Sequence, residues 1–124
     1  MRVIVCGSRN WGEYPNQREQ IYAALDGIHA VTPITFLWHG NARGVDTVAG
    51  TWAKLKKTIR VFPTPAEWSR YGDRAGPIRN KSMLGNGIDL VIAFPGGKGT
   101  TNMIAQAMRA GVKIARPLSE RDGK

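Results

Sequence analysis

Phe94-Pro95-Gly96-Gly97-Lys98-Gly99-Thr100-Thr101 stands between two apolar patterns of different period. The four residues before it, 90–93, form an unbroken Leu-Val-Ile-Ala run, and after it apolar residues recur at helical spacing between positions 103 and 108. The pattern predicts a strand, a glycine loop and a helix. Glycines leave backbone N–H groups bare at the positive end of that helix, where an anion can approach closely. We therefore expect a phosphate at this loop.

Neither of the two common glycine fingerprints describes the loop. The nucleotide-triphosphatase pattern requires Ser or Thr after its lysine, but Gly99 follows Lys98. The dinucleotide pattern Gly-x-Gly-x-x-Gly also fails, because Asn102 stands where its third glycine would be. The kinase, ATPase and ordinary dehydrogenase interpretations therefore lose their main support.

Short apolar runs rich in β-branched residues predict about five buried parallel strands, at residues 3–6, 34–38, 59–62, 90–94 and 112–115. Helices are expected between them: one that begins at Asn16 with a capping box over residues 16–19, and others over 45–57, 77–84 and 101–110. Alternation of this kind predicts an α/β fold: one Rossmann-like, doubly wound domain with helices on both faces. We expect the domain to span residues 1–116 and residues 117–124 to form a polar tail. The sequence places the following residues in the core: Trp38, Trp52, Met83, Met103 and Met108.

Three polar, glycine-bearing loops follow predicted strands, and ligands of open parallel sheets bind at the carboxyl ends of the strands. The first loop offers phosphate donors at Gly7 and Ser8 and a charge at Arg9. In the second, His39 either contacts the ligand or supports the loop, and Asp46 either binds a ribose hydroxyl or caps a helix. The predicted ligand-binding residues are Gly7, Ser8, Arg9, Trp11, His39, Gly40, Arg43, Gly44, Asp46, Arg79, Asn80, Pro95, Gly96, Gly97, Lys98, Gly99, Thr100 and Thr101.

Aromatic residues near these loops are candidates for stacking on a base, namely Trp11, Trp68 and Tyr71. The last two lie in residues 63–76, which we interpret as a lid or as a long packed connection.

Composition narrows the classes of partner. Eighteen Lys and Arg against nine Asp and Glu give a formal net charge of +9, which favours anionic ligands. The single cysteine, Cys6, excludes an internal disulfide framework and a cysteine-based zinc site, so we predict neither a metal nor a cofactor. The sequence shows no signal-peptide pattern and no apolar run of membrane length, and we expect a cytoplasmic protein.

These motifs together resemble the SLOG superfamily, the Rossmann-like domain of the SMF/DprA and LOG proteins. The resemblance is narrower to its YspA-type, YpsA-related branch, which is found in phages and in actinobacterial genomes. It rests on residues 5–11, on residues 39–46, on residues 75–83 and on the glycine loop. It implies a nucleotide or nucleotide-derived ligand, and a homodimer.

In LOG enzymes, which this loop resembles, the pattern is Pro-Gly-Gly-x-Gly-Thr-x-x-Glu, and the glutamate acts with an arginine to cleave a nucleoside monophosphate. Arg79 stands where the resemblance places that arginine, but Met103 stands at the glutamate position. A thioether cannot exchange a proton, so the reaction loses a group worth a factor of about 100 to 10,000. The resemblance therefore favours binding of a nucleotide or an ADP-ribose-like molecule, in a sensor or a sequestering protein.

Two other functions stay open. One is a LOG-like phosphoribohydrolase in which Asp46 or another carboxylate replaces the missing glutamate. The other is binding of single-stranded nucleic acid, as the resemblance to DprA and the net charge suggest.

Overall fold

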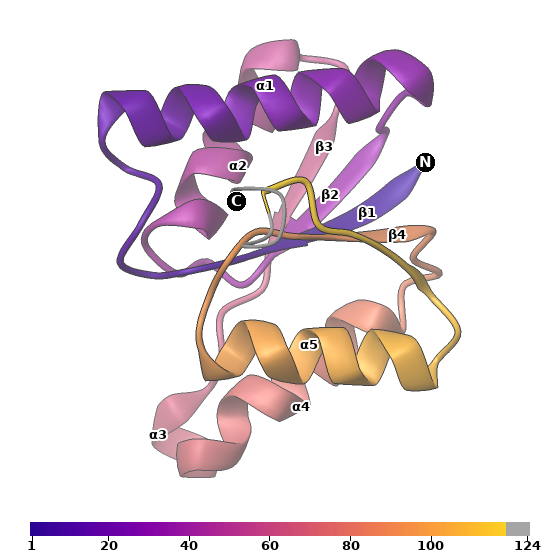
Figure 1. The fold of residues 1–124 in the computed structure, drawn as a ribbon. Helices are drawn as coiled ribbons and strands as arrows, with labels where there is room; N and C mark the ends of the chain where they lie inside the picture. Colours follow the sequence, from indigo (N-terminus) through magenta and orange to yellow (C-terminus); the bar gives the residue numbers. More distant parts are fainter. Residues whose placement is uncertain (119–124) are drawn as a thin grey trace.

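The computed structural model describes residues 1–118 and contains one sheet of five parallel strands (Figure 1). The order across the sheet is β3-β2-β1-β4-β5. The strands are β1 (Arg2–Cys6), β2 (Phe36–His39), β3 (Arg60–Pro63), β4 (Leu90–Ala93) and β5 (Lys113–Ala115). The predicted number of strands and their parallel pairing are confirmed.

Helices cover both faces of the sheet, so the predicted doubly wound architecture is also confirmed. Figure 1 shows α1 and α2 on one side of the strands and α4 and α5 on the other. The helices are α1 (Pro15–Val31), α2 (Val45–Lys56), α3 (Trp68–Tyr71), α4 (Ala75–Leu84) and α5 (Lys98–Arg109), and a 3-10 turn, Gly72–Arg74, joins α3 to α4. No helix within residues 1–118 combines the length and the apolar character that crossing a bilayer needs.

Alternate strand residues build two cores, one on each face. Val3 and Val5 of β1 pack with α1 and α2, whereas Ile4, between them, packs with α4 and α5. Trp52 is buried in the first core and Trp38 in the second, as predicted.

Met108 does not belong to either core, and its predicted burial is wrong. Its side chain is 69% exposed, whereas Met103 and Ala107 of the same helix are fully buried. Residues four apart share a helix face, so Met103 and Ala107 form one buried row, and Met108 is turned away from it.

Two helix starts differ from the predictions. Helix α1 begins at Pro15 with no side-chain cap, so Asn16 lies inside the first turn and the predicted capping box does not form. Helix α5 begins at Lys98, three residues before the predicted start at Thr101. Gly99 is therefore helical, and the loop before α5 is shorter than the sequence suggested.

Candidate functional site

A cavity of about 860 Å³ lies at the carboxyl ends of β1 and β4. These two strands are neighbours, and the chain moves outward from them in opposite directions along the sheet. This is the switch point at which open α/β sheets bind ligands. In Figure 1 the carboxyl ends of these strands lie at the end of the sheet away from the N-terminus.

The start of α5 forms one wall of the cavity. The first backbone bond of the helix runs from the Thr101 N–H to the Gly97 carbonyl at 3.0 Å. Within residues 1–118, the N–H groups of Lys98, Gly99 and Thr100 have no protein acceptor. Three unpaired donors at a helix N-terminus attract an anion.

The glycines of this loop have different reasons to be glycine. At Gly96 a Cβ would collide with Thr100 Oγ1 and would lie 2.9 Å from the backbone of Gly7, so close packing requires glycine there. At Gly97 and Gly99 a Cβ would meet nothing within 4 Å, and neither residue has a positive φ. Neither backbone strain nor internal packing explains these two glycines.

The β1–α1 loop is held against the β4–α5 loop. The Ser8 N–H donates to the Pro95 carbonyl at 2.9 Å, and the Ser8 carbonyl accepts from Val45 N–H at 3.1 Å. The first turn of α2 is thereby fixed to the same loop as the start of α5. Gly44, which precedes α2, has φ of +79°, and a Cβ there would collide with the Ser8 carbonyl.

Asp46 ties down the β2–α2 loop from inside. Its Oδ2 accepts from the N–H groups of Gly40 at 3.0 Å and Ala42 at 3.3 Å. Burial raises the pKa of Asp46 from 3.8 to about 6, although the Ala42 hydrogen bond and the Arg79 charge oppose the rise. Asp46 lines the cavity, so this carboxyl with its raised pKa faces the space where a ligand would lie.

Arg79 lines the cavity and links two loops, and its neighbour Asn80 extends the link to α5. Its Nη1 donates to the carbonyls of Gly40 at 2.7 Å and Thr64 at 3.2 Å, and its Nε donates to Asn80 Oδ1 at 3.0 Å. Asn80 Nδ2 in turn donates to the Gly99 carbonyl at 3.2 Å. The loops after β2 and β3 and the first turn of α5 are thus held in one hydrogen-bonded network.

Cys6 lines the cavity but is not a nucleophile. Burial, and then the nearby Asp46 carboxylate, raise the pKa of the Cys6 thiol to about 12. The thiolate is the reactive form, so a thiol with a pKa this high stays protonated and unreactive at neutral pH.

His39 is buried and supports the loop instead of lining the cavity. Its Nδ1 accepts from the Asn41 N–H at 3.0 Å, and a Cβ at Gly50 would lie 2.7 Å from its Nε2. Burial lowers the pKa of His39 to about 4, with the charge of Lys54 the next cause, so the ring is neutral at pH 7.

Two thirds of the predicted ligand-binding residues line the cavity. They are Gly7, Ser8, Arg9, Gly40, Asp46, Arg79, Asn80, Gly96, Gly97, Lys98, Gly99 and Thr100. The other six do not line it, namely Trp11, His39, Arg43, Gly44, Pro95 and Thr101. Trp11 packs against the core on the α1 side, and Arg43 donates to Asn10 Oδ1 at 2.9 Å on the exposed side of the loop.

The segment from 63 to 76 closes part of the cavity. Trp68 lines it and is 48% exposed, with the Arg9 guanidinium 5.4 Å from the centre of its ring, whereas Tyr71 does not line it. Asp73 and Asn102 also line the cavity, and sequence reasoning missed both. Asn102 lies one helical turn after Lys98, and this spacing was the available signal; Asp73 carried none.

Within the described residues, no group of three His, Cys, Asp or Glu side chains could hold a metal ion. The charged residues that line the cavity are Arg9, Arg79, Lys98, Asp46 and Asp73.

The chain is similar to a phage protein, to a solved structure and to one protein family. The Gene 61 protein of Mycobacterium phage D29 is 34% identical over 120 residues, which are 91% of this chain and 93% of that protein. The X-ray structure of TM1055 superposes with a TM-score of 0.69 over 92% of this chain and 72% of its own, at 17% identity, and shows that the fold is shared. Residues 1–71 match the model of the family described as YspA, cpYpsA-related SLOG. The match covers β1 to α3, and with it two of the three loops that meet at the cavity, so the chain belongs to the YspA, cpYpsA-related SLOG family.

Proposed function

We propose that the chain binds a nucleotide or a nucleotide-derived molecule in this cavity, with a phosphate at the start of α5. The observation that carries the proposal is the open space at Gly97 and Gly99. Nothing inside the protein requires glycine at either position, whereas a ligand that approaches the unpaired amides does.

Charge and size support a ligand of this kind. Arg9, Arg79 and Lys98 bring positive charge to the lining, against Asp46 and Asp73. A volume of about 860 Å³ lies within the range of cavities that hold small ligands and cofactors. We assign Asp46 to the ribose hydroxyls, because an ionised carboxylate accepts hydrogen bonds from such groups.

Gly99→Ala tests the phosphate site. Alanine suits the first turn of a helix better than glycine, so the variant should fold at least as stably as the wild type. Its methyl group enters the space that the phosphate needs, and we expect AMP, ADP and ADP-ribose to bind about tenfold more weakly or worse. Isothermal titration calorimetry measures the affinities, and thermal melting measures the stability.

Gly27→Ala is the matched control. Gly27 lies in α1, and a Cβ there also meets nothing within 4 Å, but the residue is far from the cavity lining. This variant should keep the affinity of the wild type for every nucleotide. If Gly99→Ala and Gly27→Ala bound nucleotides with equal affinity, the phosphate would not bind at the start of α5.

A second candidate is hydrolysis of the bond between base and ribose. Asp46 favours it, because a buried carboxyl with a pKa of about 6 can exchange a proton near neutral pH. In this reaction water adds to the anomeric carbon, the carbon–nitrogen bond breaks, and the base leaves with a proton. Met103, at the position of the LOG glutamate, is fully buried in the apolar core on the α5 side and does not line the cavity.

Release of free base from nucleoside monophosphates distinguishes the two candidates. Binding without chemistry predicts no release by the wild type above the uncatalysed rate. Release that disappears in Asp46→Asn, which keeps one oxygen for the Gly40 and Ala42 amides, would establish the enzyme instead.

The wider role follows from the ligand. We propose a sensor or a sequestering protein, homodimeric and cytoplasmic. Mass spectrometry of small molecules released from natively purified protein would identify the ligand, and sedimentation would measure the oligomer.

A further inference from the structure

The strand register assembles a row of arginine and aromatic side chains that the sequence keeps apart. Arg2 pairs with Phe36 across β1 and β2, and Phe36 pairs with Arg60 across β2 and β3. Two residues along each strand, Trp38 pairs with Phe62. Because side chains two apart point to the same face, all five lie on the α4 side of the sheet. We call this set the aromatic face: Arg2, Phe36, Trp38, Arg60 and Phe62.

The rings of the aromatic face are stacked on one another. The centre of the Trp38 ring is 4.8 Å from that of Phe62, and the Phe36 ring is 6.0 Å from Phe62. The Arg2 guanidinium lies 4.8 Å from the centre of the Phe36 ring and 5.0 Å from that of Trp38. Its Nε donates to the Asn86 carbonyl at 2.8 Å, so its position is fixed.

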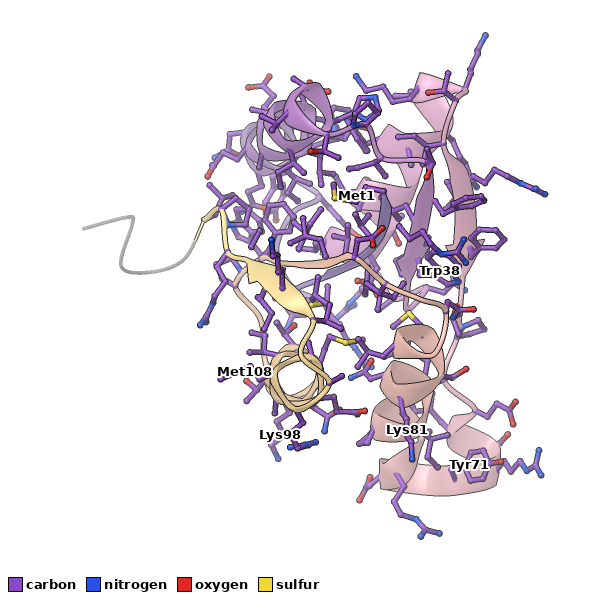
Figure 2. All side chains as sticks on the ribbon, turned by 90° about the vertical axis from the view of Figure 1, so that its right-hand side faces the viewer. Met1, Trp38, Tyr71, Lys81, Lys98 and Met108 are labelled. Carbon is purple, nitrogen blue, oxygen red and sulfur yellow. The ribbon has the colours of Figure 1, made fainter. Side chains whose placement is uncertain are left out.

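This side of the β3 edge has little cover. Helix α2 packs on β2 and β3 from the opposite face, whereas α4 packs mainly on α5. Phe36 and Phe62 are half-buried and Arg60 is exposed; within residues 1–118 the Arg60 side chain has no hydrogen bond or ion pair. Figure 2, in which Trp38 is labelled, shows no helix or strand beyond β3 at this edge.

The aromatic face is remote from the cavity. Arg2, Phe36 and Arg60 are the first residues of their strands, whereas the cavity lies at the carboxyl ends. Neither these three residues nor Phe62 lines it. Whatever binds here is therefore distinct from the ligand of the proposed function.

We propose that the aromatic face binds single-stranded nucleic acid. Bases of any sequence stack on exposed faces of aromatic rings, and arginines beside them hold the phosphates. Phe62, half-buried on the edge strand β3, supplies the stacking surface, and Arg2 and Arg60 lie on either side of its neighbour Phe36. The net charge of +9 favours approach of a polyanion.

Charge argues against a second copy of the chain on this face. A twofold dimer presents the same patch from both partners, so Arg2 and Arg60 would face an equally basic surface. Asp89 is the acidic group beside the row, and its Oδ2 accepts from the Arg2 N–H at 2.8 Å. Asp89 lies beside Arg2, so the other end of the row, at Arg60, stays basic.

Fluorescence polarisation with a labelled oligo-dT tests the proposal. Arg60→Gln should weaken binding about threefold to tenfold and reduce the salt slope by about 0.7, the value of one lost phosphate contact on a single strand. Lys54→Gln is the control, since it removes the same charge from an exposed position on α2, across the sheet. It should change binding by less than about twofold.

Phe62→Leu tests stacking separately. It keeps an apolar side chain of similar size but removes the ring, and we expect binding about tenfold weaker with unchanged AMP affinity in the cavity. Circular dichroism reports its folding; if it does not fold, Arg60→Gln decides alone. The proposal would be overturned if Arg60→Gln and Lys54→Gln weakened binding equally, or if the wild type bound no oligonucleotide. It would also be overturned if Arg60→Gln converted a dimer into monomers, because the aromatic face would then contact a second copy of the chain.

Discussion

Two buried ionisable residues on either side of the β2–α2 loop, His39 and Asp46, respond to pH in opposite directions. Asp46 is protonated more readily in the folded chain than in the unfolded one, because burial raises its pKa from 3.8 to about 6. His39 is protonated less readily when folded, because burial lowers its pKa from 6.5 to about 4. Between pH 4 and 6, the folded state thus binds the extra proton at Asp46 and the unfolded state binds it at His39.

The pH dependence of the free energy of unfolding should show the contribution of each residue when the two are replaced one at a time. Stability rises with pH where the unfolded state binds more protons, so His39 contributes a rising slope and Asp46 a falling one. Relative to the wild type, Asp46→Asn should gain about 2–3 kcal/mol between pH 4 and 6.5, and His39→Asn should lose a similar amount. Urea unfolding across this range measures the two differences.

Both variants keep a hydrogen-bond acceptor, so loop geometry is preserved while titration is removed. Other carboxylates titrate near pH 4 in all three proteins and cancel in the differences. Parallel curves for Asp46→Asn and the wild type would mean that the Asp46 carboxyl is solvated as in the unfolded chain.

At the scale of elements, the site depends on how closely the start of α2 approaches the β1–α1 loop. Gly44 combines a φ of +79° with contact against the Ser8 carbonyl. Gly111, after α5, has a similar φ of +73°, but a Cβ there meets nothing within 4 Å. A side chain at Gly111 would meet backbone strain alone, whereas one at Gly44 would meet both strain and a clash with Ser8.

Alanine at these two positions should therefore have different costs. Gly111→Ala bears only the strain of the left-handed region, about 1–2 kcal/mol of stability. Gly44→Ala adds a clash with backbone and should lose about 3 kcal/mol or more. Urea denaturation of both variants gives the comparison, and equal losses would show that α2 can shift away from Ser8.

The strands were predicted accurately from the sequence, whereas the start of α5 was not. The strands were predictable because unbroken β-branched runs fit few other structures. The start of α5 was predicted near Thr101, yet the helix begins at Lys98. Glycine keeps its N–H and costs a helix only about 1 kcal/mol relative to alanine, so Gly99 does not prevent the helix from starting before it.

Across the whole molecule, the sequence identified the loops of the site better than the side chains within them. Strand order brings the three loops together, and this follows from α/β topology. Which side chains then face the cavity depends on contacts that are distant in sequence. His39 turns toward Gly50, and Asn80 reaches Gly99, neither of which a linear pattern reveals.

The aromatic face shows the same limit more strongly. Arg2, Phe36 and Arg60 belong to three separate strands, and only parallel pairing in one register aligns them. A search along the chain for a basic stripe finds none, because the row runs across the strands.

The burial of Met103 limits which side chains this position can accept. It is fully enclosed by apolar neighbours, with Ile4, Trp38 and Met83 in the same core. A carboxylate introduced there would have to be stripped of water with no partner, a cost of several kcal/mol, comparable with the entire stability of a small domain. A chain with a thioether at this position cannot acquire a glutamate-dependent reaction here by one substitution, because a carboxylate at residue 103 would have no polar place to occupy.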